Sequence, residues 1–406
     1  MKHVNQPESG DLPRGEFWDV SKLMVVIVFW VVVFLIQMFD WHYTTYRALI
    51  LLFILITTPI LIGLAGYPSF SFPRAPRAVS RGLIIACVVL LCFQLIYFLK
   101  YFFSPRLSDV ATTTLAAGDA LLAGKNPYQL SLDPQSTMLP DSPLYQGYKY
   151  LPIMAVMYLP LSALLGERGL LLTNLLLHLA VVWLVFLLAS LIGTQSSGLF
   201  AAFLYLMLPI VPKQIFGEAV TDLAAIVPLL GGLLWVEKSP GVTGLLVGLS
   251  ISTKLLPGVL FVPCCLPASH LHRWWYAAGI VMGLLPTLVF VFWSPVELFS
   301  NIVYFNSIRP PDSTSWLYQM PPAIVSVARA VFAVVWLSTT AYVWFKPPTV
   351  ATRCGLGVIC ILCALLSGPI SHSNFQLWWL PIFAVLLGVV TLQASTSRTS
   401  VKRGVT

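Results

Sequence analysis

The sequence predicts an all-α, polytopic helical membrane protein with about twelve transmembrane helices and a large first outer loop containing juxtamembrane helices. Of its 406 residues, 58% are hydrophobic and only 9% are charged, whereas soluble domains carry roughly 25% charged residues. Apolar runs of about 20 residues, the length a helix needs to cross a bilayer, recur along the whole chain. A membrane β-barrel would instead show alternating segments of about ten residues.

Most of the predicted spans can be taken directly from these apolar runs. They are 23–39, 48–66, 82–99, 169–193, 199–212, 223–236, 274–292, 323–345, 354–370 and 374–393.

Two further apolar stretches have lengths that do not match a single crossing. Residues 151–166 would make a helix of about 24 Å and residues 241–267 one of about 40 Å, against a hydrocarbon core of about 30 Å. We interpret 151–166 as a juxtamembrane or re-entrant element. We interpret 241–267 as two short legs, 241–254 and 256–267, with Lys254 at the turn.

The basic residues suggest an orientation in the membrane. With a cytoplasmic N-terminus, both termini lie inside, and the positive-inside rule is satisfied. The inner basic residues are Arg74, Arg77, Arg81, Arg273, Lys346, Arg353, Arg398, Lys402 and Arg403. The net charge of +8 is spread over short loops, which argues for orientation and against nucleic-acid binding.

A second threading satisfies the same charges. If 151–166 spans the bilayer and 241–267 crosses only once, the termini stay inside and only residues 167–240 change sides. That region holds too few Lys and Arg residues for charge to decide between the two threadings.

The spans imply an order of regions along the chain. A cytoplasmic tail, 1–22, carries four acidic residues, so the first span is expected to be an uncleaved anchor. Two additional helices and a basic loop occupy 23–81, and the main transmembrane domain is 82–393, with its outer loop at 100–168. A basic cytoplasmic tail, 394–406, ends the chain.

Several site classes lack support in the sequence. The cysteines all lie inside apolar runs, so neither a disulfide framework nor a thiol metal site is expected. The histidines at 42, 178, 270 and 272 show no metal-like spacing, and the sequence contains no GxxxxGK[ST], GxGxxG or HExxH motif. No metal or other cofactor is predicted.

In the preferred threading, carboxylates and cations meet at the outer face, where ionisable groups are costly and therefore candidates for function. Asp109, just outside the third span, could be a general base toward a sugar or lipid hydroxyl, or the N-cap of the helix that begins there. Asp119 lies about 80° away around that helix and is expected to be simply exposed.

The other candidates are substrate-binding residues for a lipid phosphate or a sugar. Lys254 could hold a lipid phosphate or snorkel to the interface, and His372 could donate to a leaving phosphate or cap a helix. Glu218 and Asp222, four residues apart, are expected on one helical face, where they would hold an acceptor hydroxyl or simply sit at the interface. Lys149 and Arg309 complete the set as loop cations.

The chain resembles the GT-C class of integral-membrane glycosyltransferases, and within it the bacterial polyprenol-phosphate-mannose-dependent mannosyltransferase family. The stretches that carry this resemblance are Asp109 with "AAGDALLAGKNPY", then "YKYLPIMAVMYLPLSALLG", "GLLVGLSISTKLLPGVLFVPCCLP" and "GPISHSNFQLWWLP", within residues 82–393.

The resemblance implies a hexosyltransferase of the bacterial plasma membrane with its active site on the outer face. It would move a mannose-like hexose from a polyprenyl-phosphate sugar to a lipid or glycan acceptor, with inversion and without a nucleotide sugar. Asp109 matches the base position of the family, and Lys254 and His372 match positions that face the lipid phosphate. The oligomeric state is left open.

The chain also departs from the family pattern. Ala111, Thr112 and Thr113 follow Asp109 where the family often has an aromatic residue, and "GEAVTD" replaces a Gly-Gln-x-Asn type of pattern. These departures concern the sugar and the acceptor more than the class. Three alternative functions also stay open: a transporter or flippase of a lipid-linked substrate, a ligase or polymerase of lipid-linked glycans, and a non-catalytic membrane subunit.

Overall fold

The computed structural model describes Thr58 and residues 77–130, 147–308, 311, 315, 317–318, 320–369 and 372–392. The spans predicted at 23–39 and 48–66, apart from Thr58, lie outside the described residues, and so does Arg309. Every regular element in the described part of the chain is a helix. The predicted all-α class is therefore confirmed.

The helices follow one another in the chain with short connections. They are α3 (Arg77–Phe103), α4 (Asp109–Leu122), η1 (Pro127–Gln129), α5 (Pro152–Leu165), α6 (Glu167–Ile192), α7 (Gln195–Leu206), α8 (Ile210–Pro212), η3 (Lys213–Gly217), α9 (Leu223–Trp235), α10 (Pro240–Thr253), α11 (Leu255–Phe261), α12 (His270–Trp293), α13 (Pro295–Phe299), η4 (Ser300–Tyr304), α14 (Phe305–Ile308), α15 (Pro322–Phe345), α16 (Val350–Ser367), η5 (Ser373–Phe375) and α17 (Gln376–Leu392).

Five of the described helices are long and apolar enough to cross a membrane: α3 from Ser80, α6, α12, α15 and α16. A sixth crossing results if α7 and residues 210–217, bent by 59° at a short break, form one span. The runs predicted at 223–236 and 374–393 form α9 and α17, which have 13 and 17 residues. The count of about twelve is thus not reached in the described part of the chain.

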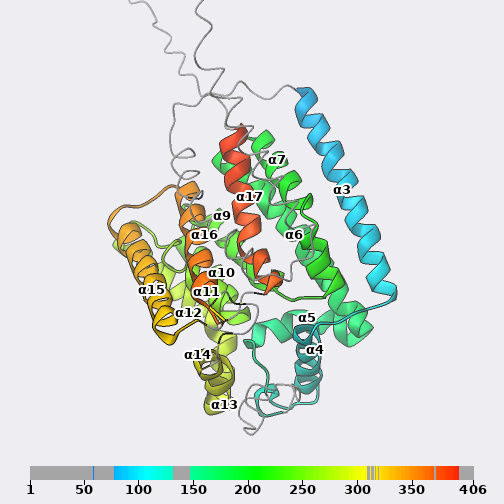
Figure 1. The fold of residues 1–406 in the computed structure, drawn as a ribbon, viewed down its shortest axis with the longest axis vertical. Helices are drawn as coiled ribbons and strands as arrows, with labels where there is room; N and C mark the ends of the chain where they lie inside the picture. Colours follow the sequence, from blue (N-terminus) through cyan, green and yellow to red (C-terminus); the bar gives the residue numbers. More distant parts are fainter. Residues whose placement is uncertain are drawn as a thin grey trace, which may run out of the picture.

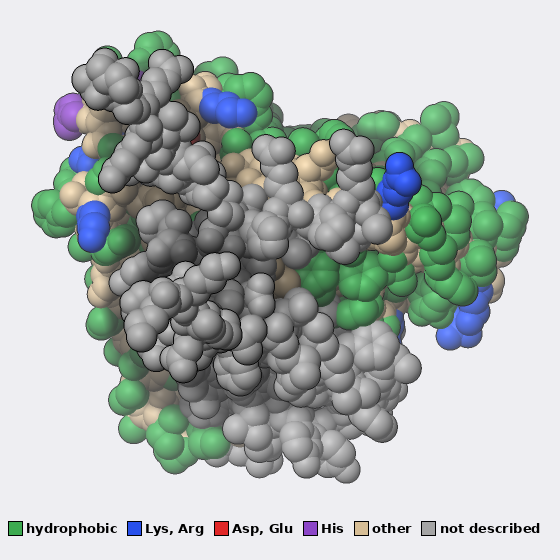
Figure 2. Space-filling model, turned by 90° about the horizontal axis from the view of Figure 1, so that it is seen from above, with side chains coloured by type: hydrophobic (Ala, Val, Ile, Leu, Met, Phe, Trp, Pro, Cys, Tyr) green, Lys and Arg blue, Asp and Glu red, His purple; other side chains and the backbone are tan. Residues whose placement is uncertain are grey.

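The long helices stand side by side in Figure 1, with α15 at one edge of the bundle and α3 at the other. The short helices α4 and α5 lie together at one end, where α5 runs across the end of α6 (Figure 1). Most of residues 151–166 thus form a crosswise helix of 14 residues, which is shorter than the helices long enough to cross a membrane. Seen from the opposite end, hydrophobic side chains occupy much of the visible outline, and Lys and Arg side chains are scattered (Figure 2).

The predicted break at Lys254 is present. α10 ends at Thr253, Lys254 has an extended backbone (φ −142°, ψ 118°), and α11 begins at Leu255. The chain turns back closely enough that a Cβ at Gly258 would lie 2.5 Å from the backbone nitrogen of Ile251. The second leg is shorter than expected, because α11 ends at Phe261.

Close contacts between small residues join α10 to α12. A Cβ added at Gly244 would lie 2.0 Å from the carbonyl oxygen of Tyr276, and one at Gly283 would lie 2.4 Å from that of Leu245. Such small-residue contacts let helix backbones approach each other where lipid removes the usual hydrophobic driving force. These contacts hold α10, which ends directly before Lys254, close against α12.

Candidate active site

The centre of the candidate site is Asp222, the residue directly before α9. Its side chain is fully buried, although an isolated carboxylate is one of the most expensive groups to remove from water. Its two oxygens therefore need partners. The structure provides three hydrogen-bond donors, from three different elements.

The first donor is Lys254, whose Nζ lies 2.6 Å from Asp222 Oδ1. Lys254 occupies the break between α10 and α11, where its side chain is only 11% exposed. The ion pair joins two residues 32 positions apart in the chain. A lysine surrounded by apolar sequence must find an anion, reach water or lose its proton, and here it has found an anion.

The other two donors come from the region around the start of α17. Asn374 Nδ2 donates to Asp222 Oδ2 over 2.9 Å, and the indole Nε1 of Trp378 donates to Oδ1. Both Asn374 and Trp378 are buried. Hydrogen bonds to an ionised acceptor are roughly twice as strong as neutral ones, so the carboxylate ties η5 and α17 to α9 and to the α10–α11 break.

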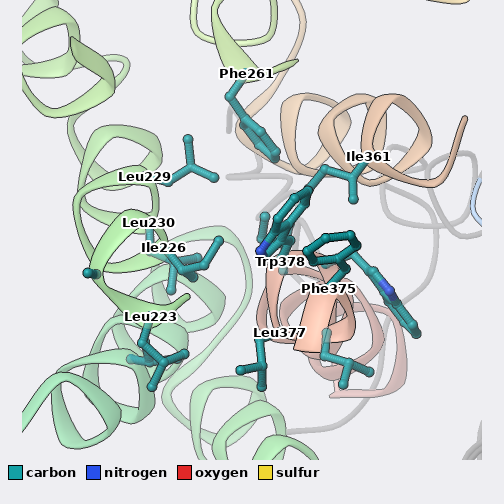
Figure 3. Close-up of a cluster of buried hydrophobic side chains, with 14 of the residues drawn as sticks. Leu223, Ile226, Leu229, Leu230, Phe261, Ile361, Phe375, Leu377 and Trp378 are labelled. Atoms are coloured by element: carbon teal, nitrogen blue, oxygen red, sulfur yellow. The ribbon is translucent and has the colours of Figure 1, made fainter. Parts of the chain in front are cut away.

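Aromatic rings surround the ammonium of Lys254. Its Nζ lies 5.5 Å from the ring centre of Tyr150, 5.4 Å from that of Phe375 and 5.2 Å from that of Trp378. The rings of Phe375 and Trp378 lie together, 4.4 Å between centres, in a cluster of buried hydrophobic side chains that also includes Leu223 and Ile226 of α9 (Figure 3). Cations over ring faces are attracted by the ring quadrupole, more strongly where water is excluded.

The position of Tyr150 is fixed by a hydrogen bond to its backbone. The hydroxyl of Tyr128 donates to the carbonyl oxygen of Tyr150 over 2.7 Å. Burial raises the pKa of Tyr128 well above its ordinary value, so this hydroxyl keeps its proton and remains a donor. The "YKYLP" stretch is thereby fixed next to the lysine.

The segment before Asp222 is irregular, and this overturns one expectation. After the π-helical turn η3, residues 218–221 are not helical, and Ala219 has a positive φ of 52°. The prediction that Glu218 and Asp222 share a helical face was therefore wrong, because it assumed a regular helix through residues 218–222. Asn174 of α6 holds the segment by donating to the carbonyl oxygens of Ile215 and Val220.

Asp109 lies at the same end of the molecule. It is the first residue of α4 but not its N-cap, because Ser108 fills that position and accepts from the backbone nitrogen of Ala111. Ser108 also donates its backbone N–H to the carbonyl oxygen of Glu218 over 3.0 Å. This bond places the 213–222 segment beside the start of α4. The Asp109 side chain is exposed.

The remaining sequence candidates lie at varying distances from the centre. Lys149 points to the ring of Phe305, 4.7 Å from its centre, whereas its neighbour Tyr150 faces Lys254. His372 is exposed, and its ring lies 5.8 Å from that of Phe375. Asp119 is exposed on α4, as expected. No group of three or more His, Cys, Asp and Glu side chains arranged for a metal ion occurs within the described ranges.

Three residues of this centre had no role in the sequence analysis: Tyr150, Asn374 and Trp378. They lie inside stretches that carried the family resemblance, "YKYLP" and "SHSNFQLWW". The sequence signal that could have found two of them was an amide, Asn374, and a tryptophan, Trp378, four residues apart at the start of the predicted span 374–393. Nothing in that pattern identifies Asp222 as their partner.

No protein-family model matches the chain, and no curated protein matches it. Among solved structures, it is similar to ArnT from Cupriavidus metallidurans bound to undecaprenyl phosphate, with a TM-score of 0.52 and 15% sequence identity. The similarity covers 75% of this chain and 59% of that one, so the chain spans about three fifths of the ArnT length. The chain is thus an integral membrane protein with an all-helical fold similar to that of ArnT.

Proposed function

We propose that the protein is a membrane glycosyltransferase that moves a hexose from a polyprenyl-phosphate sugar to a lipid or glycan acceptor. The observation that carries this proposal is the Lys254 centre, a nearly buried ammonium at a helix break beside the first outer loop. The undecaprenyl phosphate bound to ArnT supports a lipid phosphate as the ligand. A mannose-like sugar and an active site on the non-cytoplasmic face are the finer parts of the proposal.

Lys254 suits a phosphate because of its surroundings. An ammonium has three N–H donors; one goes to Asp222, and we assign the others to phosphate oxygens. The rings of Tyr150, Phe375 and Trp378 keep water from the ammonium and lower the local polarity. An electrostatic contact in such surroundings is worth more than the same contact in water.

The chemistry is a single displacement at the anomeric carbon of the donor. The acceptor oxygen forms a bond to this carbon while its proton passes to the Asp109 carboxylate. The bond from the carbon to the phosphate oxygen breaks, and the electron pair leaves with the lipid phosphate. Lys254 stabilises the charge on the leaving phosphate, as fixed donors do in electrostatic catalysis. The anomeric configuration is inverted.

The other sequence candidates take supporting roles in this proposal. His372, next to the ring of Phe375, and the loop cations Lys149 and Arg309 add positive charge for the phosphate or donors for the sugar. Glu218, joined through its backbone to Ser108, contacts the acceptor near Asp109. No metal or nucleotide is assigned a step.

The proposal is tested by Asp109→Asn, with Asp119→Asn as the matched control on the same helix. Membranes containing each full-length variant receive undecaprenyl-phosphate-[¹⁴C]mannose, and labelled acceptor is measured. We expect transfer to fall by roughly 100-fold or more in D109N, a general-base contribution, and to stay within about twofold in D119N. Near-normal transfer in D109N removes Asp109 as the base. Uptake of label without a covalent product supports a transporter instead.

A further inference from the structure

We propose that Asp222, Trp378 and Asn374 form a positioning unit that holds the ammonium of Lys254 toward the donor phosphate. In this assignment Asp222 is not a substrate-binding residue, in contrast to the reading from sequence. The inference rests on the proposed role of Lys254 in phosphate binding. Its own basis is the set of contacts around the Asp222 carboxylate.

The first step concerns what Asp222 can reach. Its side chain has no exposed surface, and its oxygens already accept from Lys254, Trp378 and Asn374. An acceptor hydroxyl would have to displace one of these buried donors, which would leave that donor unsatisfied at a cost comparable to a lost hydrogen bond. The carboxylate is therefore directed at protein groups rather than at substrate.

The second step concerns geometry. Asn374 bonds one carboxylate oxygen and Trp378 bonds the other, so together they fix the orientation of the carboxylate plane. Lys254 shares its oxygen with Trp378. A lysine has four flexible methylene groups, so a fixed anion is what defines the position of its ammonium.

The third step concerns Trp378, which acts on Lys254 in two ways. Its indole N–H bonds Asp222, and its ring lies 5.2 Å from the ammonium. Trp378→Phe removes the N–H donor and retains an aromatic ring. This substitution therefore separates the positioning hydrogen bond from the cation–ring contact.

The chain contains a matched control for this substitution. Trp379 is the next residue of α17 and is 1% exposed, and its Nε1 has no hydrogen-bond partner in the described part of the structure. Trp379→Phe deletes the same atoms from the same helix without removing a bond to Asp222. Any effect common to both variants is due to lost packing, and any difference is due to the bond.

The first measurement follows Lys254 itself. Full-length protein in detergent micelles is treated with acetic anhydride, and acetylation of Lys254 is measured by peptide mass spectrometry. We expect the rate in W378F to exceed those of wild type and W379F by about fivefold or more, because a less constrained ammonium reaches solvent more often. Asn374→Ala, at the other oxygen, is expected to act in the same direction. Equal rates in W378F, N374A and W379F overturn the positioning unit.

The second measurement connects the unit to phosphate. Binding of undecaprenyl phosphate and of neutral undecaprenol is measured by native mass spectrometry on the same proteins. We expect W378F to bind undecaprenyl phosphate about tenfold more weakly and undecaprenol unchanged, a selectivity that a general packing defect does not produce. Weakening of both lipids alike overturns the inference.

The two measurements also separate this inference from the proposed function. If the wild-type protein shows no preference for undecaprenyl phosphate over undecaprenol, the phosphate role of Lys254 fails. The acetylation comparison still decides whether Trp378 and Asn374 hold the lysine. If acetylation rises in W378F but phosphate binding is unchanged, the unit holds the lysine and its orientation toward the donor is overturned.

Discussion

Two nearly buried cations, Lys254 and Arg353, are stabilised by different kinds of hydrogen-bond partner. Arg353, in the first turn of α16, is 4% exposed and donates to the carbonyl oxygens of Cys264, Leu266 and Pro348 over 2.7–3.2 Å. Lys254 bonds a buried side-chain carboxylate and lies among aromatic rings. One cation is satisfied by backbone and the other by a charge.

The difference teaches which of the two can also serve a ligand. The planar guanidinium of arginine presents its donors in a fixed fork, and the backbone carbonyls that meet it cannot swing away. Arg353 thus fastens the turn after α11 to the start of α16. The compact ammonium of lysine has rotatable donors, and a single side chain holds it. Lys254 is therefore the cation that we propose to bind an additional anion, the lipid phosphate.

The largest expected effect is that of Lys254→Met, which leaves the Asp222 charge buried without its cation. Removing one partner of a buried ion pair typically costs about 3–5 kcal/mol, and undecaprenyl phosphate binding should be lost as well. The double variant Lys254→Met, Asp222→Asn removes both charges and should recover much of the stability, but not the binding. Thermal unfolding in detergent measures the first effect and native mass spectrometry the second.

The claim that Lys254 neutralises the buried charge of Asp222 would be contradicted if this double variant were no more stable than Lys254→Met alone. In that case the uncompensated charge of Asp222 would not be the source of the instability. Lys254, like Arg353, would then contribute to stability through its hydrogen bonds and packing and not by neutralising a charge.

A smaller effect is expected at the other cation. Arg353→Met leaves three carbonyl oxygens without a donor, and each lost hydrogen bond costs about 1 kcal/mol, so we expect a loss of about 1–3 kcal/mol. Undecaprenyl phosphate binding per folded molecule should be unchanged. The matched control is Arg273→Met: Arg273 also bonds backbone oxygens, those of Pro267 and Trp344, but is partly exposed, so its loss should cost less.

A reduced affinity of folded Arg353→Met protein for undecaprenyl phosphate would contradict the division between a structural and a ligand-binding cation. Arg273→Met, measured by native mass spectrometry in the same detergent, shows how much of any change comes from losing an arginine that bonds backbone oxygens.

The features that could be predicted from sequence are those that depend on neighbours in the chain. The all-helical class follows from apolar run lengths, and the break at Lys254 follows from a lysine in the middle of a run too long for one crossing. The exposure of Asp119 follows from helical geometry. Each of these rests on a periodicity or a length, which a single sequence displays directly.

The features that could not be predicted depend on contacts between distant residues. Trp378 and Asn374 meet Asp222 across 156 and 152 positions, and no local pattern specifies that meeting. The helical face proposed for Glu218 and Asp222 failed for a related reason. The π-helical turn and the left-handed Ala219 are backbone irregularities that apolar periodicity does not reveal.

The smallest expected effect concerns Ala219, which lies in the non-helical segment just before Asp222 and has a positive φ. The residues whose carbonyl oxygens bind Arg353 have no such backbone conformation. A left-handed conformation costs an L-residue about 1–2 kcal/mol, and Ala219 is fully buried with φ of 52°. Ala219→Gly relieves this strain but loses a buried methyl group worth about 0.8 kcal/mol. We therefore expect a change in the free energy of unfolding of less than about 1 kcal/mol.

The control is Ala225→Gly, at an equally buried position of helix α9. There no strain is relieved, so the lost methyl group adds to the helix propensity cost of glycine, and we expect a loss of about 1–2 kcal/mol. Thermal unfolding of the two variants in one detergent gives the comparison. If Ala219→Gly is destabilised as much as Ala225→Gly, the turn before Asp222 is not strained. The Asp222 carboxylate, which binds Lys254 and has no equivalent at Arg353, would then be positioned without backbone strain at Ala219.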